Sequence, residues 1–174
     1  MTSSTESAVT TQVYRVYIKA TPQAIWDAIT KPEWTEKYGY GGLADYDLRP
    51  GGIAHAHADP AMIAGAEGSG YTVPDLIIDG EVIEVDPLRK LVQTWRMLMD
   101  PGLASEAFSQ LTWEIGDGKD GVSTLTVTHD LTDAPRTAVL VSGGMADEGA
   151  GGGWSWILSD LKTLLETGER LPWQ

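Results

Sequence analysis

The sequence predicts an α+β protein in which a curved antiparallel sheet of about six or seven strands surrounds a long C-terminal helix. The helix is indicated by residues 154–167, where apolar side chains recur at helical spacing and form one stripe: Trp154, Ile157, Leu158, Leu161, Leu164 and Leu165. The sheet is indicated by the preceding chain, in which short β-rich stretches alternate with turn residues. An amphipathic helix needs an apolar surface to cover, and the strands upstream would provide it.

The beginning of the chain is predicted to form one strand and two short helices. Residues 12–19 are rich in β-branched and aromatic side chains, which favours a strand. Thr21 is a good N-cap in front of a proline, and a second proline follows residue 31, so a helix is expected over residues 22–30. A second short helix is expected over residues 32–37, and the glycine-rich residues 38–42 are expected to form a flexible loop.

Further strands are predicted between residues 46 and 131, separated by turns rich in Gly, Asp and Pro: residues 46–48, 53–58, 76–85, 90–97, 109–115 and 122–131. Residues 59–74 show no clear period, so they are predicted as either a short helix over residues 60–66 followed by a loop, or a mobile lid. Residues 133–150 are predicted to form a loop that leads into the C-terminal helix.

Length and composition suit a single domain, predicted over residues 12–174, behind a flexible N-terminus of residues 1–11. The net charge of −13 argues against nucleic-acid binding through phosphates and disfavours docking on anionic lipid. The absence of cysteine excludes disulfides, thiolate metal sites and cysteine nucleophiles. No apolar run approaches the ~20 residues of a membrane span, and the N-terminus lacks a signal-peptide core, so we expect a cytoplasmic protein.

Alternation along the strands predicts which side chains face the helix. The inner face is predicted to carry Glu81, Ile83, Val85, Leu91, Gln93, Trp95, Met97, Leu111, Trp113, Ile115, Leu125, Val127 and His129. A sheet curved around a helix diverges from it at one end, so we expect a cavity there. The predicted ligand-binding residues are Tyr38, Tyr40, Ile83, Gln93, Trp95, Trp113, Val127, Trp154 and Leu158. The expected gates are Gly39, Gly41 and Gly42 on one side and residues 59–74 on the other.

Three histidines and one glutamate are the candidates for catalysis: Glu81, His129, His55 and His57. His55 and His57 lie two residues apart, so their imidazoles share one face of a strand, as a metal site or a proton-transfer pair requires. If His129 and Glu81 point inward, they could complete a set of three histidines and one carboxylate. Alternatively, the paired histidines are partly exposed and satisfied by local hydrogen bonds, and Glu81 lies at the sheet rim beside a cation such as Arg96. We expect no tightly bound metal and no cofactor.

Four segments of the chain resemble a known family: residues 20–29, 80–87, 91–95 and 159–168. They are similar to bacterial proteins of the activator-of-heat-shock-protein-90-ATPase-like group, within the START-like, polyketide-cyclase-related superfamily often called SRPBCC. The resemblance implies a helix-grip fold, in which a curved antiparallel sheet holds the C-terminal helix around a cavity. Members of the superfamily range from carriers of lipids and aromatic ligands to cyclases. The family has no universal catalytic motif, so the resemblance assigns no catalytic residue.

Two functions are consistent with these observations. The first is binding of a small apolar or aromatic molecule between sheet and helix, either alone or with cofactor-independent acid/base catalysis such as cyclisation. The alternative is a stress- or chaperone-associated module that binds a protein partner or a second copy of itself without catalysis. A sizeable cavity with inward polar groups would favour the first function, and a filled core beside an exposed apolar patch would favour the second.

Overall fold

The computed structural model describes residues 10–172 of the chain. In chain order its elements are β1 Thr11–Ile18, α1 Pro22–Thr30, α2 Pro32–Thr35, β2 Leu43–Tyr46, β3 Ala54–His57, α3 Pro60–Gly68, β4 Leu76–Asp79, β5 Val82–Asp86, β6 Lys90–Met97, α4 Pro101–Ala104, β7 Ser109–Asp117, β8 Ser123–Asp130, α5 Pro135–Val141, a 3₁₀ turn Ala146–Glu148 and α6 Gly153–Thr167. The predicted strand at the chain start therefore begins at Thr11, and residues 1–9 of the predicted flexible N-terminus lie outside the described part.

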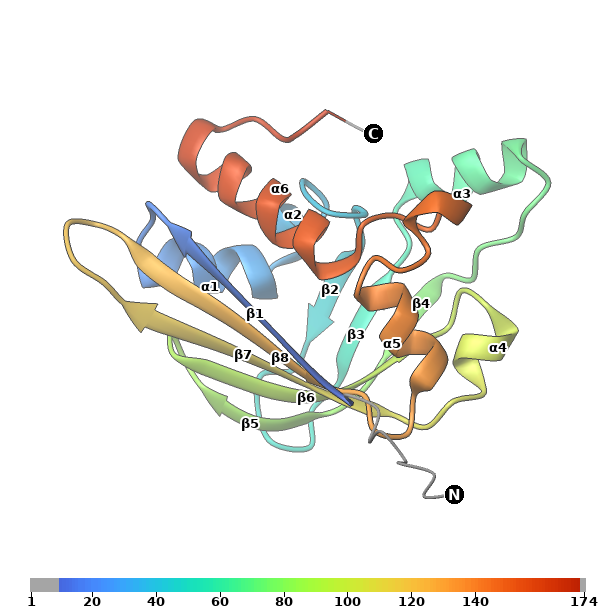
Figure 1. Cartoon of the computed structure of the whole chain (residues 1–174), viewed down its shortest axis with the longest axis horizontal. Helices are drawn as coiled ribbons and strands as arrows, with labels where there is room; N and C mark the ends of the chain where they lie inside the picture. Colours follow the sequence, from blue (N-terminus) through green and yellow to red (C-terminus); the bar gives the residue numbers. More distant parts are fainter. Residues whose placement is uncertain (1–9, 173–174) are drawn as a thin grey trace, which may run out of the picture.

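The strands form one eight-stranded antiparallel sheet in the order β1-β8-β7-β6-β4-β3-β2, with β5 paired to β6 outside this path. Figure 1 shows α6 crossing one face of this sheet, with α1 and α2 beside it. The predicted α+β helix-grip fold is confirmed. The described chain contains no helix that is long and apolar enough to cross a membrane.

The stripe predicted for the C-terminal helix is the face of α6 that packs on the sheet. Trp154, Leu158, Leu161 and Leu164 are buried, whereas Ile157 and Leu165 are half-buried beside them. The helix ends at Gly168, whose φ of 81° is left-handed and whose N–H bonds to the Leu164 carbonyl. The apolar face of α1, with Ile25, Trp26 and Ile29, completes the same core.

The single strand predicted over residues 76–85 is wrong, because it is interrupted at Gly80 and forms two strands, β4 and β5. Gly80 lies so close to β6 that a Cβ atom would overlap the Thr94 carbonyl oxygen. The break reverses the predicted faces after it: Val82 is fully buried, whereas Glu81 is exposed and Ile83 is 45% exposed. A bulge between Val82 and Glu84 then returns Val85 to the inner side.

Other differences concern the segments that frame the open end of the sheet. The predicted strand 46–48 is displaced, because β2 covers Leu43–Tyr46. The predicted loop 133–150 contains α5 and the 3₁₀ turn. Residues 59–74 form a short helix, α3, followed by an irregular segment, as one of the two alternatives had it. No residue of α3 is buried, and in Figure 1 this helix lies at the periphery of the molecule.

Candidate functional site

A cavity of about 950 Å³ lies between the inner face of the sheet and α6. Its walls come from β2, β3, β6 and β7, from α6, and from the loops around residues 38–42 and 145–151. All four methionines of the described part line it: Met62, Met97, Met99 and Met145. Thioethers are apolar and flexible, so these four side chains, called the methionine wall below, can adapt the shape of the lining to different ligands.

Six predicted ligand-binding residues line the cavity: Tyr38, Tyr40, Gln93, Trp95, Trp113 and Trp154. The remaining three lie elsewhere among the described residues. Val127 on β8 is fully buried in the core, and Leu158 is packed there at 4% exposure. Ile83 points away from the helix because of the break at Gly80. The cavity therefore lies closer to β2 and β3 than alternation alone indicates.

An uninterrupted hydrogen-bond chain connects α6 with the sheet behind the aromatic wall. The indole N–H of Trp154 donates to Nδ1 of His129 over 3.1 Å. Because an indole is only a donor, Nδ1 carries no proton, and the neutral imidazole must carry its proton on Nε2. Nε2 then donates to Oγ of Ser109, 2.7 Å away, and Ser109 donates to the Trp95 carbonyl oxygen over 2.9 Å.

These hydrogen bonds make His129 a structural residue of the core. It is fully buried, and burial lowers its pKa to about 4. The predicted inward orientation is correct, but both ring nitrogens face protein groups and the residue does not line the cavity. Ser109 gains no nucleophilic character from the pair, because the histidine donates to its hydroxyl instead of accepting from it.

The polar part of the cavity wall is a hydrogen-bonded pair formed by Tyr46 and Gln93. The Tyr46 hydroxyl donates to Oε1 of Gln93 over 2.6 Å, and burial raises the pKa of Tyr46, so it stays protonated. The amide nitrogen of Gln93 lies 3.5 Å from the Thr94 carbonyl oxygen, a position that an amide oxygen would avoid. One amide N–H therefore has only this long contact, and the described residues give the other no acceptor.

The sequence analysis selected Gln93 but missed Tyr46. Gln93 interrupts an apolar alternation within one strand, which is a local signal. Tyr46 reaches Gln93 from β2, and β4 and β3 lie between β2 and β6 in the sheet. No local sequence pattern indicates that two such distant strands contact each other.

A buried carboxylate fixes the loop that covers the mouth of the cavity. Asp160 of α6 is fully buried and accepts from the Gly39 N–H at 2.9 Å, the Leu171 N–H at 2.7 Å and the Arg170 guanidinium at 3.2 Å. Arg170 also donates to the Gly39 carbonyl oxygen over 2.9 Å and itself lines the cavity. The predicted gate is thus tied to the helix and to the segment that follows it. Sequence reasoning missed Asp160 because it lies off the apolar stripe and resembles a solvated helix residue.

The two tyrosines of this loop have different positions. Tyr38 is buried, and its hydroxyl donates to the Ala28 carbonyl oxygen over 2.9 Å, so it closes the core as well as the cavity. Tyr40 is 37% exposed and accepts from the Gly153 N–H at the start of α6 over 3.1 Å. Of the two, Tyr40 therefore lies at the outer rim of the cavity and Tyr38 lies in its floor beside the core.

His55 and His57 lie on the outer face of β3, whereas His129 is fully buried in the core. The predicted set of three histidines and one carboxylate is therefore wrong, because both ring nitrogens of His129 are hydrogen-bonded within the core. Asp45 takes the missing place: a ligand atom from each of Asp45, His55 and His57 lies within 4.8 Å of the others. His57 contacts Asp45 at 2.9 Å and Asp75 at 3.1 Å, and these hydrogen bonds, that to Asp45 above all, raise its pKa. This is the one such group within the part of the chain that the structure describes.

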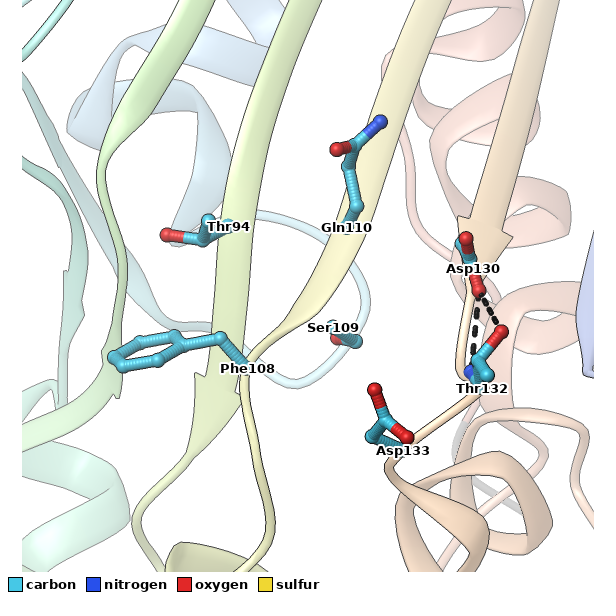
Figure 2. Close-up of a pocket in the computed structure, with 7 residues that line it drawn as sticks. All are labelled: Thr94, Phe108, Ser109, Gln110, Asp130, Thr132 and Asp133. Carbon is cyan, nitrogen blue, oxygen red and sulfur yellow. Dashed lines mark hydrogen bonds between the residues drawn. The ribbon is translucent and has the colours of Figure 1, made fainter.

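A second, much smaller pocket of about 170 Å³ opens near the end of β8. Figure 2 shows its lining: Thr94, Phe108, Ser109, Gln110, Asp130, Thr132 and Asp133. The Asp130 carboxylate is already engaged, since it accepts from the hydroxyl and the N–H of Thr132 at 2.6 and 3.1 Å, which lowers its pKa. Its size suits water or a small ion more than an aromatic ring.

Comparison with known proteins identifies the family. The family model described as Activator of Hsp90 ATPase homolog 1-like protein matches residues 19–166, most of the chain. The chain belongs to this family. Comparison with curated proteins gave no match.

Solved structures similar to this member of the Activator of Hsp90 ATPase homolog 1-like family share its fold. Protein MLL2253 from Mesorhizobium loti is 23% identical, with a TM-score of 0.60 over 89% of this chain and 96% of that one. PFC0360w, an HSP90 activator from Plasmodium falciparum, is 17% identical, with a TM-score of 0.59 over 90% and 96%. DynU16, from the dynemicin biosynthetic locus, is 22% identical, with a TM-score of 0.61 over 95% of this chain and 51% of that one. At these identities the likeness establishes the helix-grip fold of the family and no shared activity.

Proposed function

We propose that this protein binds a small apolar or aromatic molecule in the cavity between its sheet and α6. The observation that supports this proposal most strongly is the cavity itself, at about 950 Å³. Ligand sites are typically mostly apolar clefts of roughly 300–1,000 Å³ with a few placed polar groups. The cavity is at the upper end of that range, so a molecule of several fused or linked rings would fit.

The wall chemistry supports an aromatic occupant. Trp113 and Trp154 meet edge to face, with ring centroids 5.3 Å apart, and each contributes a small part of its ring to the cavity wall, since they are 7% and 5% exposed. Flat apolar ligands gain both burial and aromatic contacts on such surfaces. The methionine wall described above supplies a complementary surface that adjusts to ligand shape. Together these features favour a broad class of ring-containing ligands over one rigid shape.

The Tyr46–Gln93 pair supports an oriented ligand that carries at least one polar atom. The free N–H of Gln93 can donate to a ligand oxygen, and the phenol oxygen of Tyr46 can accept from a ligand hydroxyl. A buried donor without an acceptor costs free energy, so an occupant with a carbonyl or hydroxyl group would bind better than a pure hydrocarbon.

Binding is better supported than acid/base catalysis. Of the predicted catalytic candidates, Glu81 is exposed and His129 is enclosed by protein, so neither reaches the cavity. The ionisable residues that line it are Glu36, Tyr38, Tyr40, Tyr46, His55, Asp59, Asp100, Arg136 and Arg170; of these, His55 directs its side chain to the outer face of β3. Burial raises the pKa of the Tyr38 and Tyr46 phenols, which makes them donors and not bases near neutral pH. Cyclisation remains a hypothesis, and it would need one of these cavity-lining residues as the reacting group.

The alternative function is that of a chaperone-associated partner protein, suggested by the family name. A large apolar cavity is not needed for that role, whereas it is central to ligand binding. The two functions predict different outcomes for a cavity-filling substitution, since a protein interface on the outer surface would be unaffected by it.

The test is a fluorescence titration with N-phenyl-1-naphthylamine, a neutral apolar aromatic probe. Ala56 lies half-buried on the cavity wall, so Ala56→Trp should fill part of the space and weaken probe binding by at least about fivefold. Val13→Trp is the matched control, because Val13 is 62% exposed on β1 and does not line the cavity. Binding to wild type and to the control, with loss in Ala56→Trp, supports the proposal. No binding to wild type, or equal binding to all three folded proteins, contradicts it.

A further inference from the structure

A cluster of possible metal ligands lies on the outer face of the β2–β3 hairpin, outside the aromatic cavity wall. Asp45 on β2 is the direct antiparallel partner of His55 on β3, and His57 lies two residues further along the same strand. Residues two apart on a strand share a face, and direct cross-strand partners are the closest neighbours on it. The backbone register therefore brings one carboxylate and two imidazoles together, with ligand atoms of all three within 4.8 Å of one another.

The contacts of His57 require a cation that a neutral imidazole cannot provide. Its Nε2 lies 2.9 Å from an Asp45 carboxylate oxygen, and its Nδ1 lies 3.1 Å from an Asp75 carboxylate oxygen. A neutral imidazole has only one N–H, so one of these two contacts would bring a lone pair against a carboxylate. In that contact, either a second proton on the imidazole or a metal ion must separate the ring nitrogen of His57 from the carboxylate oxygen. Both solutions are chemically reasonable for His57 taken alone.

His55 distinguishes the two solutions. Its side chain is half-buried beside the pair, with its ring centroid 6.5 Å from that of His57. Its imidazole makes no hydrogen bond to any residue that the structure describes. A proton on His57 leaves the ring nitrogens of His55 without a partner among the described residues, whereas a metal ion bound by Asp45 and His57 would take one of them as its third ligand.

We propose that Asp45, His55 and His57 form a site for one divalent transition-metal ion. Two imidazole nitrogens with one carboxylate are the ligands that zinc and its neighbours prefer, whereas calcium and magnesium prefer all-oxygen sets. Nε2 of His57 would bind the ion, and Nδ1–H would donate to Asp75. A second carboxylate in this position is the usual outer partner of a metal-bound histidine, which it orients and makes more basic.

The position of the cluster sets the character of the site. The side chains of Asp45 and His57 are 48% and 32% exposed, so the ion would keep water ligands and exchange with solvent. Such a site would differ from the tightly bound structural metal that the sequence analysis argued against. The hairpin that carries it also forms part of the cavity wall through the opposite face of the same strands, where Ala54 and Ala56 lie.

The test is calorimetric titration of untagged, chelator-treated protein with Zn²⁺, together with Co²⁺ absorption spectroscopy. Wild type is expected to bind one equivalent of Zn²⁺ and to give Co²⁺ d–d bands of a nitrogen-containing site. His55→Ala and Asp45→Asn should each weaken Zn²⁺ binding by more than about tenfold, and Asp75→Asn by about tenfold, the typical effect of losing an outer partner. Asp86→Asn, an exposed carboxylate at the end of β5, is the control and should leave binding unchanged.

Two results would overturn the site. The first is an absence of Zn²⁺ binding in wild type, which would leave a protonated His57 as the cation between the two aspartates. The second is binding that His55→Ala and Asp45→Asn leave unchanged, which would place the ion elsewhere. His55→Gln, which keeps a polar side chain of similar length, replaces His55→Ala if circular dichroism shows that the alanine variant is unfolded.

Discussion

The Trp154 indole donates its N–H to Nδ1 of His129 across the interface between α6 and β8, over 3.1 Å. This bond, buried on both sides, joins the helix to the sheet at the back of the cavity. It also fixes the tautomer of His129 and directs the imidazole N–H toward Ser109. A neutral histidine is therefore part of the buried contact between α6 and the sheet.

The low pKa of His129 makes stability depend on pH. The folded protein holds this histidine neutral down to about pH 4, whereas the unfolded chain takes up a proton near pH 6.5. Between these values the unfolded state binds more protons, so the free energy of unfolding falls as pH falls, by about 3 kcal/mol in total. Above pH 6.5 this histidine contributes no pH dependence.

Urea denaturation at several pH values between 4 and 7 would measure the effect. His129→Leu removes the titrating group, so its unfolding free energy should decline less than that of wild type over this window. Parallel pH curves for the two proteins would show that His129 titrates normally in the folded state.

Leu161 of α6 is fully buried between helix and sheet. Leu161→Ala should lower the free energy of unfolding by roughly 2–5 kcal/mol, the usual range for a buried leucine. Val139→Ala, at a site 48% exposed on α5, should change it by less than about 0.5 kcal/mol. A denaturation midpoint that Leu161→Ala does not move would mean that α6 does not pack on the sheet as described.

Asp160 fixes the loop of residues 38–42 at the rim of the cavity, so its charge should control local opening of this loop. Asp160→Asn keeps the size of the side chain but weakens its bonds to Gly39, Leu171 and Arg170. We expect a loss of about 1–3 kcal/mol in unfolding free energy and faster hydrogen exchange at the Gly39 and Leu171 amides. Asp147→Asn, at an exposed position, serves as the control. Unchanged exchange at both amides would contradict the assigned role of Asp160.

Gln93 should allow the cavity to distinguish ligands that differ by one carbonyl group. Fluorene and 9-fluorenone share a flat skeleton, and only the ketone can accept from the amide N–H of Gln93. We expect the ketone to bind about fivefold more tightly to wild type, as one net hydrogen bond allows. Gln93→Leu should remove this preference and keep fluorene binding, as measured by equilibrium dialysis. A preference that persists in Gln93→Leu would assign it to another group.

Periodicity within single elements predicted the architecture and part of the cavity wall. The stripe of α6 and the alternation of β6 and β7 placed Gln93, Trp95 and Trp113 correctly, because side-chain direction within one element depends only on spacing. The break at Gly80 could not be predicted in this way. A close approach between strands requires that glycine, and alternation carries no information about neighbouring strands.

The polar contacts of the candidate site depend on pairing between distant segments. Asp45 meets His55 only because β2 and β3 pair in one particular register. Tyr46 reaches Gln93 only because of the curvature of the sheet, and Asp160 reaches Gly39 only because of the position of α6. Each of these residues is unremarkable in its own stretch of sequence, so its role follows from the tertiary structure alone.

The methionine wall ties the chemical character of the cavity to the oxidation state of sulfur. Oxidation of a thioether to a sulfoxide adds a polar oxygen to an apolar surface and is reversible by reductases. Met99, 41% exposed, lies where an oxidant could reach it first. We expect mild peroxide treatment, followed by mass spectrometry, to weaken N-phenyl-1-naphthylamine binding as sulfoxide accumulates while circular dichroism stays constant. The buried residues of the core, including those of α6, contain no methionine, so the ligands that the cavity binds can change without a change in fold.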